Sequence, residues 1–392
     1  MTKAKWSARA EQIESFKVMD LLKQAHMLDQ AGHQVVHMEA GEPDFGTSDA
    51  VRVAAQTALA NTPLKYTPAG GIPELRETIA QWYLQRYGLT IAPERVLVTS
   101  GASAALLMVF AVIADKGESV LMADPGYPCN RQFLRFIEAQ SINVPCGPEQ
   151  NYQLDGDSVA QNWQSNTAGV LLASPANPTG AIVDPAVLAE IAEQVRQRDG
   201  ALVVDELYHG ITYDAKETSV LNICDDAFVI NSFSKYFGMT GWRLGWLIAP
   251  ESAVPALERM AQNLYISPPS LAQYAALAAF EPESVAVFDA RRDEYRRRRD
   301  CLIAGLKALG FKIPVVPEGA FYVYADASAF TNNSQAFCWQ MLNEAFVAAT
   351  PGVDFGQHKA LSHVRFSYTT SLPQIELALT RLKAWLETYR EA

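Results

Sequence analysis

One loop of the sequence, residues 231–243, brings together side chains that suit a ligand with both an aldehyde and a phosphate. The amine of Lys235 can form an imine with an aldehyde, and a neighbouring cation or desolvation lowers a lysine pKa towards the nucleophilic free base. Arg243 offers two parallel N–H donors to a phosphate, and the hydroxyls of Ser232 and Ser234 add further donors. Taken alone, such a lysine also fits an ordinary exposed loop, so the rest of the chain has to decide.

Two further groups of polar residues directly follow predicted strands. Gly101-Ala102-Ser103 comes after the apolar run 96–98 and before a helical pattern, so backbone amides and a serine hydroxyl can meet a phosphate at a helix N-terminus. Ser103 by itself also fits a helix N-cap. Asp205 ends the apolar run 201–204, where an aspartate is either a ligand group or a helix cap, and both interpretations stay open.

The elements that position these residues form an alternating pattern. From about residue 50 to 250, apolar β-branched runs alternate with longer amphipathic stretches, which is typical of β-α-β units and a parallel sheet. Ligands bind at the carboxyl ends of the strands in such sheets, where the polar residues above are found. The clearest predicted strands are residues 96–98, 120–122, 169–172, 201–204, 228–230 and 244–248.

The last third of the chain has a different pattern. Residues 285–309 predict a long helix, and its basic run 291–299 is interleaved with acidic residues, which favours a solvated helix face over an anion site. Residues 321–324 and 363–368 predict strands, and a final helix follows from about residue 373. These segments indicate a smaller α+β domain.

Size, charge and cysteine content limit the functional class. The 392 residues favour two domains, and 49% hydrophobic with 19% charged residues is typical of a globular protein. A net charge of -11 and the lack of a long apolar run lead us to expect neither nucleic acid nor membrane as a partner. The five cysteines show no C-x-x-C pairing and favour a reducing cytoplasm, and no grouping with zinc spacing predicts a metal.

The pattern Ser-x-Ser-Lys-x-x-x-x-x-Gly-x-Arg at residues 232–243 resembles the signature of the class I/II aminotransferases, which are pyridoxal-phosphate enzymes of fold type I. The resemblance extends from about residue 40 to 365, with the family's motifs in order. It implies a large α/β domain, residues 46–284, with a mostly parallel sheet flanked by helices, and a smaller α+β domain from residues 1–45 and 285–392. It also implies that Lys235 holds pyridoxal phosphate as a Schiff base and acts as general acid and base.

The same resemblance implies roles for the other cofactor-binding residues. The Tyr127 ring stacks on the pyridine ring, and Asn177 and Tyr208 donate to the phenolic oxygen of the cofactor. Asp205 pairs with the pyridine nitrogen and keeps it protonated, which makes the ring a strong electron sink. The residues that it assigns to the phosphate are Gly101, Ala102, Ser103, Ser232, Ser234 and Arg243, with Tyr66 from a neighbouring subunit.

Substrate and oligomeric state are also implied by the resemblance. Arg365 grips the α-carboxylate of an α-amino acid, with Gly41 and Asn177 at the same subsite, so the expected substrates are α-amino acids and 2-oxo acids. Tyr66 implies a homodimer with shared active sites. Ser103 stands where some dicarboxylate-specific relatives have lysine, which disfavours aspartate and leaves neutral, branched and aromatic donors open.

Other functions fit the sequence less well. A carbon–sulfur β-lyase uses the same cofactor and stays the main alternative, because the two reactions share a carbanion. A catalytically silent regulator is disfavoured because the sequence offers no basic reading head for DNA. A dehydrogenase and a serine hydrolase are disfavoured because neither G-x-G-x-x-G nor G-x-S-x-G is present.

Overall fold

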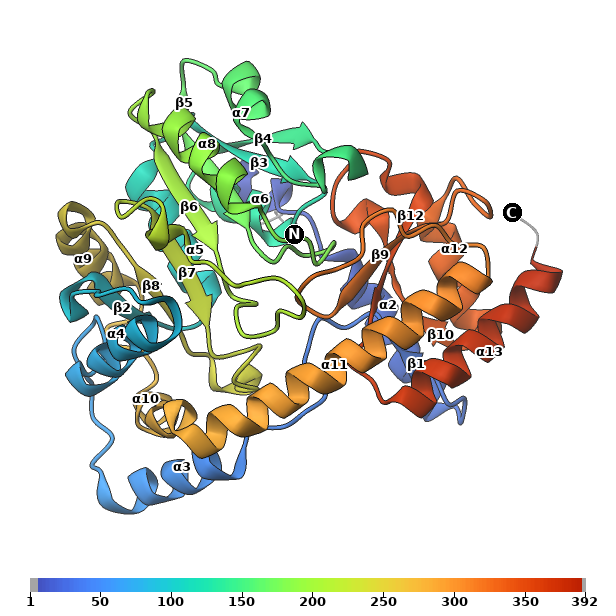
Figure 1. The fold of residues 1–392 in the computed structure, drawn as a ribbon, viewed down its shortest axis with the longest axis horizontal. Helices are drawn as coiled ribbons and strands as arrows, with labels where there is room; N and C mark the ends of the chain where they lie inside the picture. The colour runs from blue at the N-terminus through green and yellow to red at the C-terminus, as the bar shows by residue number, and fades with distance from the viewer. Residues whose placement is uncertain (1–5, 390–392) are drawn as a thin grey trace, which may run out of the picture.

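A seven-stranded mixed sheet forms the centre of the larger part of the molecule (Figure 1). The computed structural model describes residues 6–389. Within the sheet β8 is antiparallel to both of its neighbours and all other pairs are parallel, which confirms the predicted mostly parallel sheet. The strands in spatial order are β2 (Val96–Thr99), β8 (Gly245–Ile248), β7 (Phe228–Ser232), β6 (Ala201–Asp205), β5 (Thr167–Ala173), β3 (Ser119–Asp124) and β4 (Gln140–Pro145).

Helices cover both faces of this sheet, so its central strands are buried on both sides. That burial explains why strands such as β6 and β7 consist almost entirely of β-branched and other apolar residues. The edge strand β4 lacks that signal, because its side chains are largely exposed and its backbone pairs only with β3. The helices of this part are α3 (Asp49–Asn61), α4 (Pro73–Tyr87), α5 (Ala102–Ile113), α6 (Pro128–Phe136), α7 (Gly156–Asn162), α8 (Pro185–Arg196), α9 (Val254–Leu264) and α10 (Ser270–Leu277).

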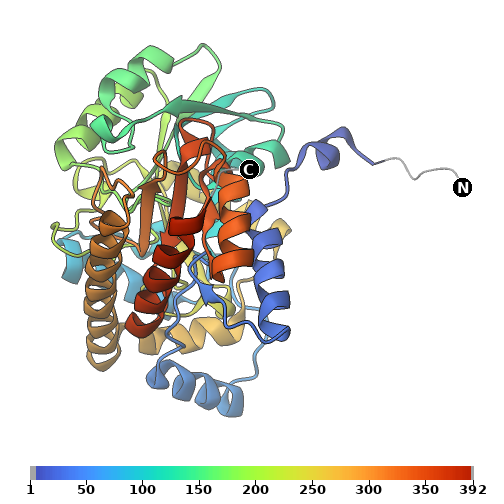
Figure 2. The same cartoon turned by 90° about the vertical axis from the view of Figure 1, so that its right-hand side faces the viewer.

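The remaining elements gather around two small sheets. One sheet is antiparallel, in the order β11 (Thr350–Pro351), β12 (His363–Ser367) and β9 (Tyr322–Asp326), and the other pairs β1 (Val36–His37) in parallel with β10 (Val347–Ala348). Figure 2 shows the helices of this part side by side over these strands. They are α2 (Lys17–Gln30), α11 (Pro282–Ala308), α12 (Ser334–Gln340) and α13 (Leu372–Thr388), while the short α1 (Ala8–Gln12) precedes them in the chain. This is the expected α+β arrangement, and the boundaries at residues 45 and 284 stay a prediction.

The long helix α11 runs from α10 and α3 to α13 and so joins the two parts of the molecule (Figure 1). Its basic run is not simply a solvated face. Arg298 and Arg299 are buried, and besides acidic neighbours in α11 they pair with Asp44 and Asp214 from other segments. The solvated interpretation of this run was therefore wrong for two of its arginines.

No helix among residues 6–389 is long and apolar enough to cross a membrane.

Candidate active site

Lys235 lies in the loop that follows β7, with its amine between the two parts of the molecule. The Nζ atom donates a hydrogen bond to the carbonyl of Gly41 at 2.6 Å and lies 5.9 Å from the centre of the Tyr208 ring. Burial lowers the pKa of Lys235 to about 8, Glu42 opposes that shift, and the nearby Arg365 and Arg243 add to it. The amine therefore loses its proton far more easily than an ordinary lysine, although its protonated form still predominates at pH 7.

Asp205 ends β6, the strand next to β7 in the sheet, and is 3% exposed. Among the described residues, its carboxylate accepts one hydrogen bond, from the backbone N–H of Leu207 at 3.2 Å. Burial raises the pKa of Asp205 to about 7, against the opposing effects of that hydrogen bond and of Lys235. A buried carboxylate with so few partners has the properties needed to bind a cationic group such as a protonated ring nitrogen.

The segment 101–103 and the loop after β7 meet at the N-terminus of α5. This helix starts at Ala102, and its N-cap Gly101 provides no side-chain cap, so the first amides of the helix are free to bind an anion. The N-cap interpretation of Ser103 is therefore wrong, because Ser103 lies inside the first turn, where it is exposed. A Cβ at residue 101 would lie only 2.7 Å from Nη2 of Arg243, so Gly101 allows the arginine to approach the helix end.

In the Lys235 loop, Arg243 is exposed to solvent and the two serines are buried. Arg243 is exposed and adopts a left-handed backbone conformation with φ 52°. Ser232 and Ser234 are buried, and the Ser232 hydroxyl accepts a hydrogen bond from the Ser234 N–H at 3.0 Å. The loop thus holds its own turn together with one serine and presents the arginine at its end.

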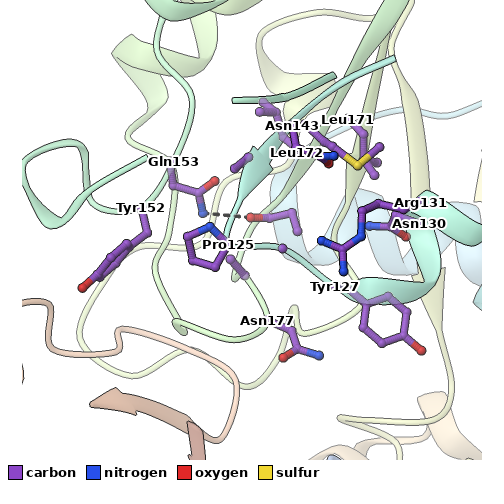
Figure 3. Close-up of a pocket in the computed structure, with 15 residues that line it drawn as sticks. Pro125, Tyr127, Asn130, Arg131, Asn143, Tyr152, Gln153, Leu171, Leu172 and Asn177 are labelled. Carbon is purple, nitrogen blue, oxygen red and sulfur yellow. Dashed lines mark hydrogen bonds between the residues drawn. The ribbon is translucent and has the colours of Figure 1, made fainter. Parts of the chain in front are cut away.

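Tyr127 and Asn177 line a cavity at the carboxyl ends of β3 and β5 (Figure 3). Arg131 and Gln153 also line this cavity. The Tyr127 ring meets Phe16 edge-on at 6.2 Å, so the segment before α2 reaches this part of the site. In Figure 3 Asn177 and Tyr127 lie on the same side of the cavity.

Arg365 extends from β12 towards Asn177 and is 3% exposed. Nη1 donates to Oδ1 of Asn177 at 3.0 Å, while Nη2 donates to the carbonyl of Glu39 and to Oγ1 of Thr350. Nε has no hydrogen-bond partner among the described residues. The guanidinium is therefore oriented by three acceptors and still has donor capacity for an anionic ligand.

Several residues that contact Arg365 did not stand out in the sequence. The guanidinium lies over the rings of Tyr322 at 4.4 Å and Phe355 at 4.8 Å, and the Tyr322 hydroxyl lies 2.7 Å from that of Tyr208. A Cβ at Gly41 would collide with the Tyr322 hydroxyl, which explains the glycine. The only available signal was the position of Tyr322 in a predicted strand beside the strand of Arg365.

The structure therefore brings most of the predicted site residues into one region and leaves Tyr66 apart from them. Tyr66 lies between α3 and α4 and is 79% exposed. This exposure leaves its ring available to another subunit.

Comparison with known proteins identifies the family. Residues 33–382 match the family model described as aminotransferase class I and II. The chain belongs to this family. This confirms the predicted enzyme class, an aminotransferase, and the predicted fold type.

Individual relatives of this aminotransferase cover nearly its whole length. It is 41% identical over 376 residues to the valine–pyruvate aminotransferase of Mycobacterium tuberculosis, covering 95% of this chain and 97% of that protein. It is 35% identical over 378 residues to the aspartate/prephenate aminotransferase of Thermus thermophilus, covering 96% and 97%. The crystal structure of an aminotransferase from M. tuberculosis superposes with a TM-score of 0.96 at 40% identity, covering 99% and 100% of the two chains.

Proposed function

We propose that this aminotransferase binds pyridoxal phosphate through Lys235 and transfers the amino group of an α-amino acid to a 2-oxo acid. The observation that carries the proposal is the convergence of a lysine with a lowered pKa, the buried carboxylate of Asp205 and the carboxylate-binding Arg365 on one site. When bound, pyridoxal phosphate supplies an aldehyde for the amino group and a ring that withdraws electrons from the substrate's α-carbon.

The residues of the site fit that cofactor. The free amides at the start of α5 and the nearby Arg243 suit a phosphate, and the poorly partnered Asp205 suits a protonated pyridine nitrogen. Arg365 already donates to Oδ1 of Asn177, which leaves the Asn177 amide N–H groups for an acceptor such as the phenolic oxygen. In this assignment Ser232, Ser234, Tyr127 and Tyr208 complete the cofactor site, as the sequence predicts.

The chain's own groups provide the binding and proton-transfer steps. Arg365 binds the substrate α-carboxylate with its free N–H groups and holds the amino acid beside Lys235. The neutral Nζ of Lys235 takes the proton from the substrate's α-carbon and delivers it to the cofactor carbon that carries the amino group. A pKa of about 8 suits this role. Asp205 holds the ring-nitrogen proton in a buried setting, where the pair of charges is little screened by water.

For the donor we propose a neutral aliphatic α-amino acid. The relative named valine–pyruvate aminotransferase is 41% identical to this chain, and Ser103 supplies no cation for a second carboxylate. The rival is aspartate, since a 35% identical relative is an aspartate/prephenate aminotransferase. We expect kcat/KM for valine to exceed that for aspartate by about tenfold or more, equivalent to about 1.4 kcal/mol. The variant Ser103→Lys should shift that ratio towards aspartate, and a wild type that prefers aspartate would contradict the donor class.

Transamination is favoured over the β-lyase because the named relatives described above are all aminotransferases. The alternatives can be separated by their products. Release of ammonia and pyruvate from a cysteine conjugate, without amino transfer, would favour the lyase.

A homodimer in the cytoplasm completes the proposal. The exposed Tyr66 supports a shared site, because the described residues leave 79% of it accessible. The five cysteines are free, which suits a reducing compartment.

The decisive experiment is an absorption spectrum of the purified protein with pyridoxal phosphate, compared with Lys235→Ala. We expect a cofactor band that depends on Lys235 and shifts when an amino acid is added. Lys383→Ala, at an exposed position of α13, is the matched control and should retain the band. The absence of any Lys235-dependent band would contradict the assignment of the cofactor to this lysine.

A further inference from the structure

The backbone segment 36–41 holds both functional cations of the site. The carbonyl of Glu39 accepts hydrogen bonds from Nη2 of Arg365 and from Oγ1 of Thr350, and the carbonyl of Gly41 accepts from Nζ of Lys235. The segment itself is fixed between two strands, because the Met38 N–H donates to Ala348 and the Met38 carbonyl accepts from Ser367. A shift of this segment therefore moves the acceptor that orients Arg365.

The buried side chain of Glu39 anchors the segment through a contact with His37. It is 0% exposed, and its Oε1 lies 2.7 Å from Nδ1 of His37. The other oxygen, Oε2, has no partner among the described residues. On the outer side, Nε2 of His37 lies 2.8 Å from Oδ2 of Asp29, and Oδ1 of Asp29 accepts from the Val35 N–H. A buried carboxylate with one polar partner depends strongly on that partner.

Among the described residues, His37 is the one hydrogen-bond partner of the Glu39 carboxylate, and its side chain is partly exposed. The hydrogen bond to Glu39 raises the pKa of His37 to about 9, burial opposes the shift, and Asp29 adds to it. His26 of α2 faces the His37 ring at 5.5 Å, and Arg381 of α13 donates to the carbonyl of Gln34. A protonated His37 ring can donate through Nδ1 to Glu39 and through Nε2 to Asp29 at the same time.

We propose that Glu39 is a positioning residue for the substrate α-carboxylate: with the His37 imidazolium it fixes the backbone carbonyl that orients Arg365. The inference rests on the proposed function, in which Arg365 binds that carboxylate. Its direct consequence is a dependence of substrate binding on a histidine that contacts no substrate. Because the histidine pKa is raised in the folded protein, the stabilising contact is complete below pH 6.5 and is lost as the pH rises through about 9.

Glu39→Gln is the first test, since it keeps the size of the side chain and removes its charge. We expect KM for the amino acid to rise about tenfold, the usual effect of losing an outer partner of a binding group, with kcat changed much less. Calorimetric binding of propanoate, a carboxylate without an amino group, should weaken by a similar factor. His33→Gln, which alters a histidine stacked on Phe346, is the matched control and should change neither value.

Two further measurements separate positioning from a general structural role. The wild-type KM should rise above about pH 9, and this rise should be absent in Glu39→Gln and His37→Gln. Nuclear magnetic resonance of labelled histidine should show the pKa of His37 falling towards its ordinary value in Glu39→Gln. If Glu39→Gln does not fold, Glu39→Asp and the pH dependence of the wild type still test the idea.

The outcomes also separate this inference from the proposed function. If Arg365→Lys raises KM but Glu39→Gln leaves KM and propanoate binding unchanged, the positioning role is wrong and the substrate assignment stands. If Arg365→Lys leaves propanoate binding unchanged, the substrate assignment itself fails. Parallel losses of kcat and of stability, without a change in KM, would also overturn the positioning role.

Discussion

At the scale of single residues, the site depends on two groups whose charges are disfavoured by burial. Lys235 loses its proton more easily than an ordinary lysine, and Asp205 holds its proton more tightly than an ordinary aspartate. Both shifts are caused mainly by desolvation, and the two groups partly compensate each other. A cationic ligand beside Asp205 would offset the free energy that burying this charge costs. The site thus favours the ligand-bound protein and lowers the stability of the free protein.

This argument predicts how Asp205→Asn changes the stability of the cofactor-free protein. Because the folded pKa is raised from 3.8 to about 7, the wild type loses stability as the pH rises through that interval, by at most about 4 kcal/mol. The variant lacks this loss, and its side-chain oxygen can still accept from Leu207. Urea unfolding at pH 5 and pH 8 should therefore show a smaller pH effect in Asp205→Asn. An equal pH effect in both proteins would contradict the burial of a charge at this position.

The same substitution should weaken the retention of pyridoxal phosphate, because the amide cannot neutralise a protonated ring nitrogen. Equilibrium dialysis measures this directly. If Asp205→Asn is more stable without cofactor and binds the cofactor less tightly, the effect of the buried charge on stability is separated from its effect on cofactor binding.

At the scale of elements, α11 joins the two parts of the molecule through a buried arginine. Arg298 is 4% exposed, and its Nη1 lies 2.9 Å from both carboxylate oxygens of Asp44, while Nε donates to Glu294. Its guanidinium also lies over the ring of Phe45. The helix thus holds the segment that leads from Gly41 into the larger part.

Arg298→Lys is expected to lower the free energy of unfolding by about 1 to 3 kcal/mol, because an ammonium group cannot make all of these contacts. Arg297→Lys is the matched control on the same helix. Its side chain is 70% exposed and pairs only with Glu294 among the described residues, so we expect a change within about 0.5 kcal/mol. Chemical denaturation measures both, and equal effects would contradict the special role of the buried arginine.

The elements also show how far the sequence could predict the structure. The apolar strands and the signature loop indicated the sheet and the positions of Lys235 and Asp205, because their pattern is local. The contacts of Arg365 were not predictable in the same way, since Glu39, Thr350 and Tyr322 come from three distant segments whose pairing is set by strand register. The exposed strand β4 and the buried arginines of α11 were missed for a related reason, because local periodicity does not show what a neighbouring segment covers.

At the scale of the whole molecule, the exposed Tyr66 predicts a site completed across a dimer. Mixing Tyr66→Ala with Lys235→Ala subunits tests this by complementation. If Tyr66 serves the partner's site, hybrid dimers contain one intact site and activity returns, although each variant alone is impaired. If it serves its own chain, each site in the hybrid carries a defect and mixing restores nothing. Different affinity tags on the two variants show, by co-purification, that the subunits have exchanged.

The reversed strand β8 has a further consequence for how this chain can change. Ser232 at the end of β7 pairs with Gly245 at the start of β8, so the intervening loop leaves and re-enters the sheet at neighbouring points. Both Lys235 and Arg243 lie in this loop. The β7–β8 ladder contains none of residues 233–244, so we expect a graft that replaces this loop as a unit to transfer both groups with their spacing. Substitutions outside residues 233–244, for example near the contact of Phe16 with Tyr127, then leave the spacing of Lys235 and Arg243 unchanged.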